Sequence, residues 1–248
     1  MIGNNLSVSV NDVKKYVAIT LLATALAGCD DHSAPLSFTP EMASFSNEFD
    51  FDPLRGPVKD FTQTLFNDKG EVTKRVTGTM SEEGCFDTLE LHDLEANTGV
   101  ALVLDANYYV DAETQQQKVK LQGKCQLAEL PSAGVTWDTD DNGFVVAAHG
   151  KEMEVKYRYD ADGYPLGKTT VSGDQHLSVQ STPSKDLRKR MDYTAVSLLN
   201  DKPLGKVTQS CDYDSRNNPV SCELVIANDS GKNAVERKYT IKNTIEYY

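Results

Sequence analysis

The sequence predicts an all-β fold, an antiparallel meander of hairpins that follows a cleaved signal peptide. Polar and apolar side chains alternate in residues 118–127, 152–159 and 235–247. A period of two is typical of antiparallel strands with one buried and one exposed face. Turn residues recur between these segments, and no long stretch after residue 28 has a helical period. We expect an extended curled sheet, with a β-sandwich as the alternative.

Residues 1–28 have the features of a secretory signal peptide. Lys14 and Lys15 supply its positive charge, residues 16–25 are apolar, and small residues precede Cys29. A membrane-spanning helix is the alternative, but the thirteen residues 16–28 fall short of the about 20 that a span needs. We therefore expect cleavage directly before Cys29.

The run Leu26-Ala27-Gly28-Cys29 resembles the lipobox of bacterial lipoproteins, in which the Cys is S-diacylglycerated and its new amino terminus is N-acylated. An ordinary leader and a buried core Cys are the alternatives. Two acyl chains already suffice for stable anchoring, so a lipidated Cys29 would hold the protein at a membrane.

Two acidic residues, Asp30 and Asp31, follow the lipobox cysteine. An Asp in this place resembles the signal that retains lipoproteins of Gram-negative bacteria in the inner membrane. We therefore expect the folded part to lie on the periplasmic side of the cell inner membrane, with Asp30 and Asp31 as the sorting residues.

Residues 29–57 are expected to form the lipidated N-terminus and a partly ordered tether, and residues 58–248 the antiparallel β domain. Prolines interrupt the tether. However, Phe45, Phe49 and Phe51 make it too apolar for a solvated spacer. We expect residues 45–51 to pack on the domain, as a strand or as a docking segment.

Turn sequences separate the expected strands of the domain. They occupy residues 67–70, 97–99, 140–143, 160–163 and 216–218. Gly and Asn in these turns accept a positive φ. The stretches 159–166 and 213–220 are similar to each other, and 66–72 is a looser third copy. Convergent turn chemistry explains this similarity as well as an internal repeat does.

Four cysteines remain if Cys29 is lipidated, and four cysteines allow three pairings. Cys211 and Cys222 flank a predicted hairpin, so we pair them. Cys85 is then left with Cys125, and strand alternation points both side chains at a core. Free thiols are the alternative, but the periplasm is oxidising. A metal cluster is disfavoured because no Cys-x-x-Cys occurs.

The mature sequence, including residues 36–45 and 239–248, resembles the YnfC family of bacterial lipoproteins. The resemblance extends over nearly all of it. It implies a lipid anchor and an envelope compartment, and it brings no catalytic residues.

The chain is acidic, with 25 Lys and Arg against 37 Asp and Glu and a net charge of −12. Such a polyanion repels phosphate backbones, so nucleic acid is not expected as a partner. We expect contact with the membrane through the lipid anchor and, as a possibility left open, an envelope protein partner.

No hydrolase, phosphate-loop or dinucleotide motif occurs, and we expect no cofactor. Residues 138–143 match the start of a calcium loop, with Asp138, Asp140 and Asn142 as oxygen ligands. The position of the bidentate Glu is occupied by His149, so a β-turn with surplus acid is the favoured interpretation.

These features favour a non-enzymatic protein that binds or scaffolds a component of the cell envelope. The alternative is a carbohydrate-directed envelope hydrolase whose two carboxylates come from separated strands.

Overall fold

The computed structural model describes residues 34–228 and 235–248. Within them, Pro35–Tyr248 is one compact unit. The leader and the predicted lipidation and sorting residues Cys29, Asp30 and Asp31 lie outside the described residues. No helix in the described ranges is long and apolar enough to cross a membrane.

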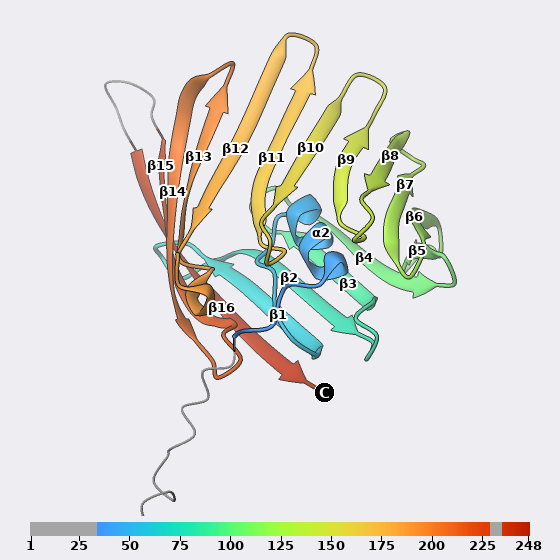
Figure 1. The fold of residues 1–248 in the computed structure, drawn as a ribbon, viewed down its shortest axis with the longest axis horizontal. Helices are drawn as coiled ribbons and strands as arrows, with labels where there is room; N and C mark the ends of the chain where they lie inside the picture. The colour runs from blue at the N-terminus through green and yellow to red at the C-terminus, as the bar shows by residue number, and fades with distance from the viewer. Residues whose placement is uncertain (1–33, 229–234) are drawn as a thin grey trace, which may run out of the picture. The chain divides into compact units, whose positions relative to one another are not determined.

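Strands of the described residues form a single antiparallel sheet that closes into a barrel (Figure 1). They are β1 (Val58–Phe66), β2 (Val72–Met80), β3 (Phe86–Asp93), β4 (Thr98–Asp105), β5 (Tyr108–Asp111), β6 (Gln117–Gln122), β7 (Gln126–Leu130), β8 (Val135–Thr139), β9 (Val145–His149), β10 (Glu154–Tyr159), β11 (Pro165–Ser172), β12 (Gln175–Pro183), β13 (Tyr193–Leu199), β14 (Lys202–Tyr213), β15 (Pro219–Asn228) and β16 (Val235–Tyr247). Each pairs with the next along the chain.

Closure distinguishes this barrel from the expected open sheet. The meander is confirmed, but the curled sheet and the sandwich are wrong because β1 pairs with β16, from Val58 opposite Tyr247 to Phe66 opposite Thr240. Alternation in a sequence shows which face of a strand is buried. It does not show that the first and last strands of a meander meet.

A helix, α2 (Pro40–Phe49), lies in the segment that the sequence predicted as a partly ordered tether, with residues 45–51 packed on the domain as a strand or as a docking segment. Thr39 caps its first turn by accepting a hydrogen bond from the N–H of Met42. Pro40 is at the start of the helix, where a backbone N–H would have no partner within the helix. The helix ends at Asp50, whose φ of 55° is left-handed. The strand prediction was wrong because Met42, Phe45 and Phe49 have helical spacing, which a ten-residue element shows only briefly.

The interior of the barrel holds α2 (Figure 1). Met42 and Phe45 belong to a core formed with inward-facing side chains of β1 to β10. The ring of Phe45 lies 4.9 Å from that of Phe86 and 5.6 Å from that of Tyr109. The helix therefore fills one half of the barrel and leaves the half beside β11 to β16 less tightly packed.

Two lysines from the barrel wall hold the C-terminal end of α2. Lys74 donates to the carbonyl of Asp50 at 2.6 Å, and Lys168 donates to the carbonyl of Asn47 at 2.9 Å. Cations stabilise the negative end of a helix dipole, and α2 has no basic residue in its last turn. The wall therefore supplies the charge that the helix lacks.

Four turns share one hydrogen-bonding geometry. They begin at Asn67, Asp140, Asp160 and Asp214. In each, the first side chain accepts the N–H groups of the residues two and four positions later. The residue three positions later has a positive φ. These turns confirm the predicted hairpin connections, and their shared hydrogen bonds account for the similarity between their sequences.

Candidate ligand-binding cavity

A cavity of about 370 Å³ lies between the segment that follows α2 and the β11 to β16 wall. Its lining is mostly apolar, from Phe51, Pro53, Leu65, Val76, Pro165, Val179, Met191, Ala195, Val207, Leu224 and Ile241. A few polar side chains interrupt this lining. They include Asn47, Asp52, Gln63, Ser181 and Gln209. Small-molecule sites in proteins have this size, roughly 300 to 1,000 Å³, and this composition.

Asp52 is the carboxylate enclosed by this cavity. Its backbone is fixed by Gln63, which accepts the N–H of Asp52 at 3.0 Å and donates to its carbonyl at 2.6 Å. Its Oδ2 accepts a hydrogen bond from Gln209 at 3.1 Å. Burial raises the pKa of Asp52 to about 6, against the lowering effects of Gln209 and Lys74.

Gln209 is 5% exposed and lines the cavity. Its amide nitrogen donates to Asp52 at 3.1 Å and to the carbonyl of Met191 at 3.2 Å. Because both partners are acceptors, the orientation of the amide is fixed. Its Oε1 is buried without a hydrogen-bond partner in the structure. Buried polar atoms are nearly always paired, so this oxygen is an acceptor available to a ligand.

Asn47, which is 8% exposed, lines the cavity from α2, and its side chain is a hydrogen-bond partner of Tyr159 on β10. The unpaired acceptor of Gln209 on β14 is therefore the buried polar atom that the cavity offers to a ligand.

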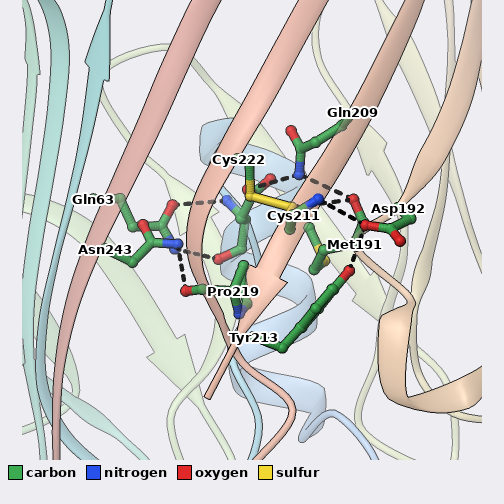
Figure 2. Close-up of a disulfide and its surroundings, with 10 residues drawn as sticks. Gln63, Met191, Asp192, Gln209, Cys211, Tyr213, Pro219, Cys222 and Asn243 are labelled. Atoms are coloured by element: carbon green, nitrogen blue, oxygen red, sulfur yellow. Dashed lines mark hydrogen bonds between the residues drawn. A yellow bond between two sulfur atoms is a disulfide. The ribbon is translucent and has the colours of Figure 1, made fainter.

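One end of the cavity is closed. Tyr164 and Met191 are each 3% exposed there, and Gln209, Met191 and Asp192 gather around the disulfide of Cys211 and Cys222 (Figure 2). Backbone and side-chain hydrogen bonds then tie this end to residues 36–55.

Arg55 is the centre of those bonds. Its guanidinium pairs with Asp162 at 2.7 Å and donates to the carbonyl of Leu36 at 2.7 Å. Asn218, fully buried, accepts the N–H of Arg55 at 2.6 Å and donates to its carbonyl at 2.8 Å. The two residues join the segment after α2 to the β10–β11 and β14–β15 turns.

Towards the other end, the inward face of the wall becomes exposed. Leu177 follows the inward alternation of Val179 and is 38% exposed. Leu177 stands opposite Leu199 on β13. Leu177 and Leu199 thus extend the apolar inward face of the wall from the cavity towards the β11–β12 and β13–β14 turns.

A second hollow, of about 640 Å³, is lined by β1, β15 and β16. Its charged residues Asp68, Glu223, Lys238 and Lys242 are all exposed. It lacks the enclosed carboxylate and the unpaired buried oxygen of the first cavity, which is therefore the better candidate site.

The predicted cysteine pairs lie at disulfide distance. Cys85 and Cys125 have Cα atoms 5.9 Å apart and join the β2–β3 and β6–β7 turns. Cys211 and Cys222 are opposite each other on β14 and β15, with Cα atoms 4.0 Å apart. Both pairs lie at the same end of the barrel as Arg55.

The suggested calcium residues are used in other contacts. Asp138 pairs with His149 at 2.9 Å, and Asp140 organises its own turn through the N–H groups of Asn142 and Phe144. Across the described part of the chain, no three or more His, Cys, Asp or Glu side chains are grouped to hold a metal ion. The turn interpretation accounts for these residues.

Asp52, Gln63 and Gln209 were not singled out by sequence reasoning. They come from the segment after α2, from β1 and from β14, and no spacing links them. Gln63 and Gln209 are buried amides on strands with alternating burial, which is the one signal that could have indicated them.

The site and the fold together define a closed antiparallel barrel with an internal helix and a cavity suited to a small ligand. Comparison with known proteins places this chain in a family. The model of "Uncharacterised protein family (UPF0257)" matches residues 13–248, so the chain belongs to that family.

Close relatives bear the name "UPF0257 lipoprotein YnfC". The protein from Salmonella dublin is 69% identical over 236 residues, which are 95% of this chain and all of the relative. The Salmonella typhi protein is 68% identical over the same share of both chains. These relatives confirm the predicted family resemblance and its lipoprotein character.

Among solved structures, the chain is similar to a porin-like protein from Bacteroides uniformis. The TM-score is 0.41 and the identity 10%, over 76% of this chain and 96% of the other.

Proposed function

We propose that this lipoprotein binds a small, mainly apolar molecule inside its barrel. The observation that carries the proposal is the cavity of about 370 Å³, with apolar walls and a few enclosed polar groups. Such a site favours an apolar ligand because its transfer from water contributes about 25 cal/mol per Å² of buried apolar surface.

The proposal includes the location of the protein in the cell. Cys29 is the lipidated residue, and Asp30 with Asp31 retains the protein in the inner membrane, facing the periplasm. The support is the lipobox sequence and the lipoprotein name of the relatives. A partner protein of the cell envelope that delivers or receives the ligand is consistent with this location.

The hydrolase alternative gains no support from the cavity. Its lining carboxylates, Asp50 and Asp52, come from one short segment, and Asp50 is paired with Lys168 at 3.0 Å. A glycosidase needs an acid and a second carboxylate facing each other across a sugar. Binding without chemistry therefore describes the site better.

Photolabelling of the full chain in lipid nanodiscs tests the proposal. The probe is a twelve-carbon alcohol that carries a diazirine and an alkyne. We expect labelled peptides from β12, β13 and β14, which supply Val179, Ala195 and Val207 to the cavity. Labelling confined to other surfaces contradicts the proposal.

Two neighbouring substitutions provide a matched pair for this experiment. Ala195→Trp places an indole in the cavity, whereas Val196→Trp places it on the outward face, where Val196 is 38% exposed. Ala195→Trp should abolish cavity labelling and Val196→Trp should retain it. Circular dichroism of each variant shows whether the barrel is folded.

A further inference from the structure

The polar end of the cavity presents hydrogen-bond acceptors. The unpaired Oε1 belongs to the same amide whose nitrogen donates to Asp52. A carboxylate accepts up to about four hydrogen bonds, so Asp52 and Gln209 together present adjacent acceptor atoms. A ligand group with several N–H donors and a positive charge complements them.

The neighbouring charges leave this acceptor pair free for a ligand cation. Lys74 faces Asp52 from β2, but its Nζ donates to the Asp50 carbonyl at 2.6 Å, and burial lowers its pKa. Tyr164, Tyr193 and Tyr213 also face Asp52, and burial raises the pKa of each above its ordinary value. These hydroxyls stay neutral at physiological pH.

The apolar part of the site extends away from the acceptor pair. Val179 and Val207 line the cavity, and Leu177 and Leu199, opposite each other on β12 and β13, continue the same inward face towards the β11–β12 and β13–β14 turns. A ligand that fills this path has a polar head at Asp52 and a hydrocarbon chain along β11 to β14.

We propose that the ligand is a single-chain amphiphile with a protonated primary amine, which Asp52 and Gln209 bind at the closed end of the cavity. This inference rests on the proposed function, because it names the chemical class of the molecule that the barrel binds. A charge-assisted pair in an enclosed site is about twice as strong as a neutral hydrogen bond.

Competition against the photolabel measures the head-group preference. Dodecylamine, dodecan-1-ol and dodecanoate share a chain length and differ in the head. In full-length protein at pH 7.5, we expect dodecylamine to compete roughly tenfold better than dodecan-1-ol, a difference of about 1.4 kcal/mol, and dodecanoate to compete least. Equal competition, or dodecanoate as the best competitor, overturns the inference.

Asp52→Asn tests the role of the carboxylate. The ratio of amine to alcohol competition should fall from roughly tenfold to near one in this variant, measured in the same nanodiscs so that partitioning cancels. A ratio unchanged by Asp52→Asn overturns the assignment. Labelling by the neutral probe itself reports on the proposed function, so the failures of the two proposals are distinguishable.

Acid should have the same effect on the wild-type protein. Because the pKa of Asp52 is raised to about 6, the amine preference should decline between pH 7 and pH 5, while an alkylamine keeps its charge. A preference that is constant over this range contradicts binding by Asp52. Lysophosphatidylethanolamine as a further competitor distinguishes a lipid head group from a free amine as the source of the ligand.

Discussion

Asn218 shows how one side chain closes an end of the barrel. Its amide bridges the N–H and the carbonyl of Arg55 and also donates to the hydroxyl of Tyr247 at 2.8 Å. Asn218→Ala leaves the N–H and the carbonyl of Arg55 buried without these partners, at a cost of about 3 kcal/mol in the free energy of unfolding. Urea unfolding measures it.

Asn142 provides the control for this prediction, because it lies in a turn of the same geometry and is exposed. Asn142→Ala should change the free energy of unfolding by no more than about 0.5 kcal/mol. Equal losses in the two variants would show that the Arg55 contacts do not stabilise the fold.

Asp52 gives stability a pH dependence of known sign. Its pKa is raised from the ordinary value of 3.8 to about 6 on folding, so the folded protein holds the proton more tightly. The contribution of Asp52 to the free energy of unfolding is fully present below about pH 4 and is lost as pH rises through about 6. The total loss is up to about 3 kcal/mol.

Comparison of wild type with Asp52→Asn isolates that contribution. Between pH 4 and pH 7, the free energy of unfolding of the wild type should fall relative to that of Asp52→Asn as pH rises. The same comparison for the exposed Asp68→Asn should be flat. A flat difference for Asp52 as well would mean that its carboxylate is not buried.

At the scale of single residues, the sequence carried part of this information. Alternation on β1 and β14 indicates which side chains face inward, yet it does not distinguish Gln63 and Gln209 from other inward residues. Their meeting with Asp52 depends on barrel closure and on the reversal at Asp50. No local pattern encodes either event.

At the scale of elements, the two cysteine pairs fix turns at the end of the barrel that Arg55 closes. Non-reducing peptide mapping should recover Cys85 with Cys125 and Cys211 with Cys222. A peptide that joins Cys85 to Cys211 would refute the pairing. Free thiols on exported protein would refute the expected location in an oxidising compartment.

Removal of each pair should destabilise the protein to a different degree. With sequence separations of 40 and 11, chain entropy gives about 4 kcal/mol for Cys85 and Cys125 and about 3 kcal/mol for Cys211 and Cys222. Double alanine variants unfolded in urea provide these values.

Strands and turns were largely predictable because each carries a local signal. The period of two marks β10 and β16, and a side chain that accepts two N–H groups marks the turns at Asp160 and Asp214. Helix α2 was not predicted. Its ten residues bury polar Ser44 and Ser46 beside Met42 and Phe45, which obscures the apolar stripe that identifies longer helices.

At the scale of the whole molecule, the fold is a meander whose first and last strands pair, so that the sheet closes into a barrel. Helix α2, which precedes the first strand, packs in the interior of this barrel. The all-β class and a meander of hairpins were predicted from the sequence. Closure was not, since the β1 to β16 pairing joins residues nearly a whole domain apart and depends on the summed twist of every strand between them.

The lipid anchor and the membrane location of the whole molecule can be tested by substitution of Cys29, Asp30 and Asp31. Cys29→Ala should abolish palmitate labelling and leave an uncleaved precursor, because the acyl chains attach to this residue. Asp30→Ser with Asp31→Ser should keep the label and move the protein to the outer membrane on a density gradient. Wild-type protein without label would refute the anchor, and a double variant that stays would refute Asp30 and Asp31 as sorting residues.

The central claim is that the barrel interior admits an apolar ligand, and the reactivity of a cysteine placed inside it tests this most directly. Ala195→Cys puts a thiol on the cavity wall, and Val196→Cys puts one on the outward face. Iodoacetamide reacts with each in nanodiscs, with and without dodecan-1-ol. We predict that the alcohol slows the reaction at residue 195 by roughly tenfold, as expected when the ligand is near ten times its dissociation constant, and leaves residue 196 unchanged. Equal rates at residue 195 with and without the alcohol would contradict the account.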